Sequence, residues 1–158
     1  MEIIQTLTGA ICAVGFAVLF NVHGKKLWLL FLGGALDWIV YLVCMRWGGG
    51  IFVSMLLATA TAALSSEILA RIVHAPVLLL MVPMLIPLVP GGDLYHTMRA
   101  LILADKESLM VYSQKTLLQA AAIALGIIAV SSFMHVLQVL REYLKEEKAK
   151  ESNRKTMK

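Results

Sequence analysis

Residues 83–96 read PMLIPLVPGGDLYH, and this stretch decides the fold of the chain. It lies inside a long apolar region and interrupts it. Three prolines remove three backbone hydrogen-bond donors, and two glycines follow the last of them directly. An acid, a phenol and an imidazole come next. The pattern predicts a helix that breaks at Pro90-Gly91-Gly92 inside a membrane. A helix that only had to cross a bilayer would not need such a break.

Composition is typical of an integral membrane protein. Of the 158 residues, 59% are hydrophobic and 15% are charged, and the mean hydropathy is +0.81. A soluble domain carries about 25% charged residues. Seven Lys and Arg lie in residues 141–158. The net charge of +4 therefore describes a basic tail beside a membrane rather than a surface that binds nucleic acid.

Five apolar segments predict an all-α membrane domain over residues 1–140, followed by a basic cytoplasmic tail over residues 141–158. A helix needs about 20 apolar residues to cross a bilayer. The predicted spans are residues 3–22, 27–45, 51–72, 77–104 and 116–140, the fourth being broken at Pro-Gly-Gly. Residues 77–89 alone would reach only about 20 Å as a helix. The two halves of the fourth segment could cross together, or they could form a re-entrant hairpin.

Small residues recur at four-residue spacing in three of these segments. The clearest sets are Gly9, Ala13 and Ala17, then residues 58–63, then Ala122 with Gly126, and Ala120 with Ala124. Such stripes let helices approach closely in lipid. They exceed what five helices need for packing among themselves, so we expect them to be partner surfaces as well.

The distribution of Lys and Arg predicts an N-terminus outside and a C-terminus in the cytoplasm. With five crossings, ten of the fourteen Lys and Arg lie on the cytoplasmic side, as the positive-inside rule requires. A re-entrant fourth segment would put Lys25 and Lys26 on the wrong side. Five crossings are therefore favoured.

Two acids, Asp37 and Glu67, fall within the unbroken predicted spans. An ionisable group near mid-bilayer costs about 2.5–3.5 kcal/mol and usually faces a protein interior or a water-filled path. Asp37 is therefore a candidate coupling or substrate site, and a protonated Asp hydrogen-bonded to another helix is the structural alternative. Glu67 is a second candidate, although Arg71 four residues later favours an ion pair at the membrane boundary.

The break offers a binding mechanism of its own. The first turn of a half-helix over residues 93–104 would present free N–H groups and the positive end of a helix dipole at membrane depth. Discontinuous helices hold carboxylate substrates and coupling ions in several transporter folds. Alternatively, Asp93 caps its own helix. The predicted substrate site consists of Pro90, Gly91, Gly92, Asp93 and Tyr95.

The sequence carries no signature of an enzyme, a cofactor or a metal. There is no nucleotide-binding loop and no Ser-His-Asp arrangement, and the Cys and His residues lack partners at ligand spacing. We expect Cys12 and Cys44 to behave as small hydrophobic residues. The chain is therefore predicted not to be an enzyme and to bind no cofactor.

Residues 67–95 contain three motifs in order: Glu-Ile-Leu-Ala-Arg at 67–71, Ala75-Pro76, and Pro-Leu-Val-Pro-Gly-Gly-x-Leu-Tyr at 87–95. With the length and the five-segment hydropathy, this pattern resembles the bacterial threonine/serine exporter family. Over about residues 1–140 the chain is similar to the small membrane subunit that corresponds to the C-terminal half of the full-length exporter. In this resemblance, Pro90-Gly91 and Tyr95 are the residues that match positions of the family's motif.

The resemblance implies a multi-pass protein of the bacterial inner membrane that works with a larger partner subunit. It implies secondary export of threonine or serine, or of a dicarboxylate such as succinate in two-subunit versions, driven by the proton gradient. Because five is an odd number of crossings, a fused or paired copy of this half would have the opposite orientation in the membrane, as an inverted repeat requires. The alternative is a membrane scaffold or assembly subunit without a transport site, in which the break is only a packing kink.

Overall fold

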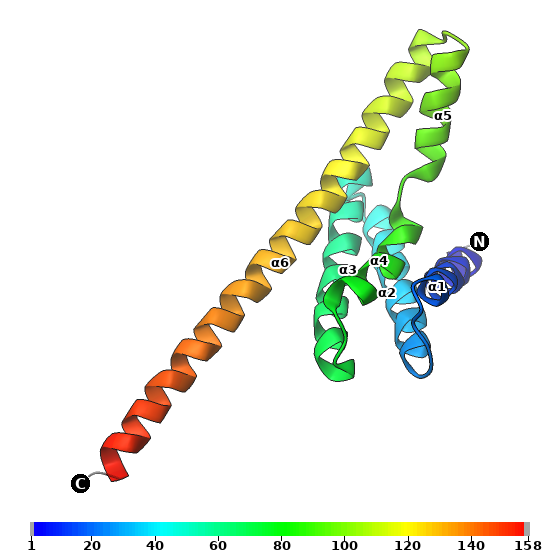
Figure 1. The fold of residues 1–158 in the computed structure, drawn as a ribbon. Coiled ribbons are helices and arrows are strands. Elements are labelled where there is room, and N and C mark those ends of the chain that lie inside the picture. Colours follow the sequence, from blue (N-terminus) through cyan, green and yellow to red (C-terminus); the bar gives the residue numbers. More distant parts are fainter. Residues whose placement is uncertain (1, 157–158) are drawn as a thin grey trace.

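The protein is an assembly of helices in a computed structural model that describes residues 2–156, with side chains described up to residue 147. Residues 157 and 158 of the predicted tail lie outside this range. The helices are α1 (Glu2–Leu19), α2 (Lys26–Arg46), α3 (Gly50–Val73), α4 (Val77–Leu85), the 3-10 helix η1 (Ile86–Leu88), α5 (Gly91–Ile102) and α6 (Lys106–Thr156) (Figure 1).

Four helices in the described part of the chain are long and apolar enough to cross a membrane: α1, α2, α3 and the Lys106–Glu147 part of α6. Val77–Leu88 and Gly91–Ile102 pass the same test as a pair, which gives up to five spans. The prediction of an all-α membrane protein is confirmed. The chain bends by 56° between the two halves. A bend of this size at a short break is found in broken spans and in re-entrant loops.

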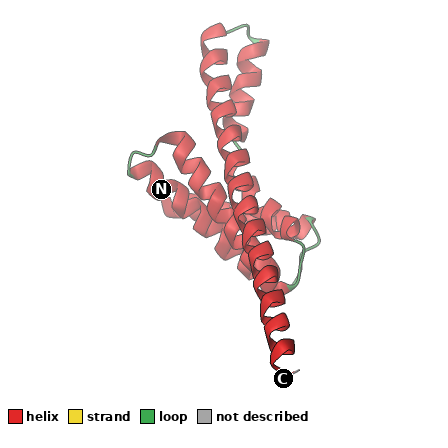
Figure 2. Ribbon diagram, turned by 90° about the vertical axis from the view of Figure 1, so that its left-hand side faces the viewer, coloured by secondary structure: helices red, strands yellow, loops and turns green. Residues whose placement is uncertain are grey.

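The first four helices form a bundle, and α6 runs past it. α1 packs on α2, α2 on α3 and α3 on α6, and α4 contacts each of the first three. The N-terminal part of α6 pairs with α5 in a hairpin that projects from the bundle (Figures 1 and 2). With 51 residues, α6 is about 77 Å long, more than twice the thickness of a hydrocarbon core.

The predicted span at residues 116–140 is the middle of this longer helix. No Gly or Pro interrupts residues 106–125. Asp105 begins the helix, because its carboxylate accepts a hydrogen bond from the backbone N–H of Ser108 at 3.2 Å. The polar residues after Asp105 therefore form the first turn of α6 instead of a loop.

The small-residue stripes pack inside the chain. Ala13 and Ala17 of α1, Ala58 and Ala62 of α3, and Ala122 of α6 are all completely buried. The expectation that these stripes are partner surfaces is therefore wrong for the buried positions, because neighbouring helices of the same chain already cover them. Of the predicted small residues on α6, Ala120 and Ala124 are the exposed ones.

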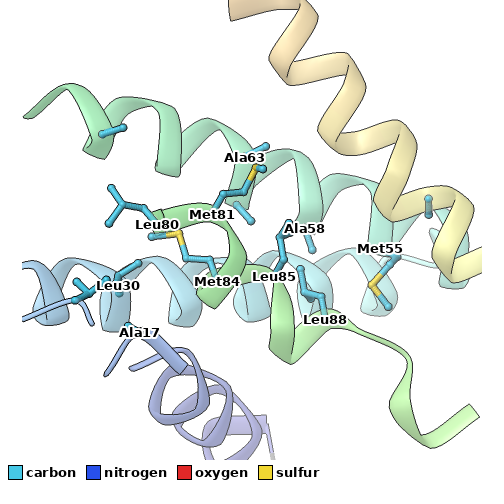
Figure 3. Packing of buried hydrophobic residues seen from close by; sticks show 14 residues of the cluster. Ala17, Leu30, Met55, Ala58, Ala63, Leu80, Met81, Met84, Leu85 and Leu88 are labelled. Carbon is cyan, nitrogen blue, oxygen red and sulfur yellow. The ribbon is translucent and has the colours of Figure 1, made fainter. Parts of the chain in front are cut away.

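The broken helix fills the centre of the bundle. Side chains of α4 and η1, including Leu80, Met84 and Leu88, are buried in one cluster with residues of α1, α2 and α3. Figure 3 shows them beside the ribbons of α2 and α3. Pro83 is also buried, within α4 itself. The half of the broken helix before Val89 is thus surrounded by the protein, whereas Gly91 and Gly92 at the break are exposed.

Candidate functional site

Asp37 is a buried acid without a partner. Its residue is 1% exposed, and neither carboxyl oxygen has a hydrogen-bond partner within the described residues. The indole N–H of the adjacent Trp38 is also buried and unpaired there. Leaving a polar group buried without a hydrogen bond costs about 1–3 kcal/mol. The structure provides no helix–helix hydrogen bond for Asp37, and that bond is what a purely structural role needs.

The face of α2 that carries Asp37 looks toward the broken helix. A Cβ atom added at Gly33 would meet the side chain of Met84 on α4. Asp37 follows one turn later on the same face, and Tyr41 follows after another turn. Asp37 and Tyr41 therefore lie on the side of α2 that packs on α4, the first half of the broken helix.

A cavity of about 290 Å³ opens beside the break. It is lined by Ile4, Gln5, Thr8, Gly9, Cys12, Trp38 and Pro87. Its size is near the lower end of ligand pockets, at about 300 Å³. A larger cavity of about 380 Å³ lies near the Glu2–Arg46 ion pair, and no residue of the break lines it. The smaller cavity is the one that joins α1, α2 and η1 at the break.

The start of α5 has backbone donors without an acceptor in the described part of the chain. The N–H of Gly91 donates to Val89 O at 2.7 Å, and the N–H of Leu94 donates to Pro90 O at 3.0 Å. Between them, the N–H groups of Gly92 and Asp93 have no hydrogen-bond acceptor in the described part of the chain. Gly91 and Gly92 are exposed, and no atom lies within 4 Å of a Cβ placed on either. The helix begins at Gly91 rather than at Asp93.

Asp93 does not cap its own helix. No side chain provides a cap hydrogen bond at the start of α5. Instead, the carboxylate of Asp93 accepts a hydrogen bond from the side-chain amide of Gln119 on α6 at 2.8 Å. The hydroxyls of Thr97 and Thr116 meet one turn along the same seam at 3.4 Å. Polar contacts therefore join α5 to α6, and they hold the start of the half-helix in place.

A comparison with known protein families gives a match over most of the chain. A family model described as "Threonine/Serine exporter, ThrE" matches residues 5–133, which include Asp37, the break and Gln119. The chain belongs to the threonine/serine exporter family. Among individual proteins, none of the curated ones gives a significant match, and the same is true of solved structures.

Two further predicted residues of this exporter-family chain lie apart from Asp37. Glu67 pairs with Arg71 at 3.6 Å, in the i,i+4 arrangement that the sequence favours. Tyr95 is 65% exposed, and its ring contacts the neighbouring imidazole of His96. Within the described residues, no hydrogen bond or ion pair connects Glu67 or Tyr95 to Asp37.

Two polar residues of these helices, Gln119 and Tyr41, were not predicted from the sequence. Gln119 is 6% exposed and lies in an apolar run, so the reasoning applied to Asp37 would have identified it. Tyr41 has no comparable signal, because a Tyr in a membrane helix is common. As for metals, no group of three His, Cys, Asp or Glu side chains within residues 2–147 could hold an ion.

Proposed function

We propose that this chain is one membrane subunit of a secondary exporter that moves a small amino acid such as threonine or serine, or a dicarboxylate, out of the cell. It acts in the bacterial inner membrane with a larger subunit of the same family. The observation that carries the proposal is the buried Asp37, which has no partner within the described residues and lies on the side of α2 that packs on α4. A scaffold does not need an acid in that position.

The break and the acid have separate tasks in this proposal. The free N–H groups of Gly92 and Asp93, at the positive end of the α5 dipole, hold the carboxylate of the substrate. Asp37 has no partner within the described residues, so its negative charge is neutralised when it takes up a proton or when a cationic group of the substrate pairs with it. Occupation of the two sites in turn would couple export to the proton gradient.

The larger subunit would supply the other half of the transport path. With five crossings, a paired half of similar topology has the inverted orientation that many transporters use.

Replacing Gly91 and Gly92 by Ala separates an exporter from a scaffold. Neither new methyl group meets an atom within 4 Å, so the fold should accept both substitutions. A methyl at this helix end would keep a ligand away from the backbone donors, and losing a charge-assisted hydrogen bond lowers flux by about tenfold or more. The measurement is export by the two-subunit complex in liposomes with an imposed pH gradient.

Gly15→Ala is the matched control for this experiment, since its Cβ position is equally open and lies on α1. It should leave export unchanged. If the Gly91 and Gly92 variants instead lower the accumulation of the larger subunit while flux per complex stays normal, the scaffold alternative is correct.

The orientation of the chain makes a second testable prediction. A reporter fused after Lys158 should be active in the cytoplasm, because the seven Lys and Arg of residues 141–158 favour retention on that side. A matching reporter placed in the turn at Trp47–Gly49 should be active on the outside. Activity of the Lys158 fusion in the periplasm would contradict the proposed topology.

A further inference from the structure

A second cavity lies at the tip of the α5–α6 hairpin, away from the break. Its volume is about 240 Å³. It is lined by His96, Arg99, Ala100, Leu103, Asp105, Ser108 and Tyr112. None of the residues at the break lines it. The residues that follow at the tip are Lys106 and Glu107, so the cavity lies at the polar end of the hairpin.

The cavity contains one positive and one negative side chain that do not neutralise each other. Arg99 comes from α5, and Asp105 lies at the start of α6. The ion pairs found in the described residues join Arg46 to Glu2 and Arg71 to Glu67, so Arg99 and Asp105 are farther than 4 Å apart. Both charges are therefore available to a ligand.

Asp105 keeps its charge at neutral pH. Hydrogen bonds from the side chain and the backbone N–H of Ser108 hold the pKa of this carboxyl below its usual value. The same contact fixes the carboxylate at the first turn of α6.

The walls of the cavity suit a short, polar side chain. The imidazole of His96 and the ring of Tyr112 stack with their centroids 4.8 Å apart. Ser108 and Tyr112 bring hydroxyl groups, and Ala100 is a buried apolar residue on the α5 side. A ligand with a short chain and a hydroxyl would find partners for each of its parts.

We propose that this cavity binds a free amino acid in its zwitterionic form, with the carboxylate on Arg99 and the ammonium group on Asp105. A guanidinium binds a carboxylate through two parallel hydrogen bonds. A dicarboxylate would place its second carboxylate against Asp105, and this like-charge contact disfavours it. The cavity therefore selects amino acids over dicarboxylates, and its role as a station on the export path rests on the proposed function.

The test is equilibrium binding of labelled L-threonine to the full chain in lipid nanodiscs at neutral pH, with succinate as a competitor. Arg99→Gln and Asp105→Asn should each weaken threonine binding by about tenfold or more, as expected for the loss of one charged partner. Asn is itself a good N-cap residue, so Asp105→Asn should leave α6 intact. Succinate should compete poorly with the wild-type protein, and better relative to threonine with Asp105→Asn.

Lys106→Gln and Glu107→Gln are the matched controls, because both charges are exposed at the same tip and neither lines the cavity. They should change threonine binding by less than about twofold, a difference of under 0.5 kcal/mol. An undetectable affinity of the wild-type chain for threonine would overturn the inference. So would equal loss in the controls, or succinate displacing threonine as well as threonine itself does.

Export measured with the same variants keeps this inference apart from the proposed function. If Arg99→Gln and Asp105→Asn bind and export threonine normally, the tip is not an amino acid site, and the exporter proposal stands. If the wild-type two-subunit complex exports neither amino acids nor dicarboxylates, the proposed function fails whatever the tip binds.

Discussion

Export should fall by at least about a hundredfold when Asp37 is replaced by Asn, while the protein reaches wild-type levels in the membrane. Asn has nearly the same size as Asp and can make similar hydrogen bonds, but it cannot carry the proton or the charge that the proposed coupling step requires. A hundredfold loss corresponds to about 2.7 kcal/mol, within the range expected for losing a charged group at a buried site. The measurement is proton-driven flux in liposomes, normalised to the amount of complex.

Asp37→Leu distinguishes a functional acid from a structural one. Because both carboxyl oxygens are buried without partners, an apolar residue at this position should leave stability unchanged or raise it by about 1–3 kcal/mol. A thermal unfolding midpoint at or above that of the wild type, combined with no flux, would support a role in transport. A lower midpoint for Asp37→Leu would assign Asp37 to the fold. If Glu67→Gln stops export and Asp37→Asn does not, the coupling role belongs to Glu67.

The boundaries of most helices could be predicted because single residues determine them. Gly24, Gly48 and Gly50 have positive φ angles at the ends of predicted spans, and these are conformations that glycine adopts without strain. The break at Pro90-Gly91-Gly92 was visible because proline removes a backbone donor and glycine weakens a helix. The start of α6 at residue 106 was not, because hydropathy shows which residues suit lipid and says nothing about where a helix begins outside it.

The partners of the site residues could not be predicted, because they come from distant parts of the chain. The spacing of Gly9, Ala13 and Ala17 shows that they share a face, but not that α2 covers it. Asp93 could plausibly have capped its own helix, and only the packing of α5 on α6 brings Gln119 to it. Likewise, the sequence indicated that Asp37 is costly in a membrane, whereas its position on the side of α2 that packs on α4 follows from the close approach of Gly33 to Met84.

The contact between α1 and α2 leads to the second large effect. A Cβ atom at Gly34 would lie 2.8 Å from Cβ of Ala13 and 3.6 Å from Cα of Ala10. Both alanines are completely buried and have no flexible end that can move aside. Gly34→Ala should therefore push the two helices apart and lower the free energy of unfolding by about 1–3 kcal/mol. The measurement is the thermal unfolding midpoint of the purified chain in detergent or nanodiscs.

Substitutions at two other glycines, Gly33 and Gly15, provide comparisons for this result. At Gly33 the new methyl group would collide with the terminal methyl and sulfur of Met84, a side chain that can rotate, so Gly33→Ala should cost less than Gly34→Ala. At Gly15 nothing lies within 4 Å, and Ala there should be neutral or stabilise the helix by up to about 1 kcal/mol. An unchanged midpoint for Gly34→Ala would mean that α1 does not pack this closely on α2. Since Gly9 and Thr8 of α1 line the cavity that Pro87 also lines, the same looseness would remove one wall of that cavity.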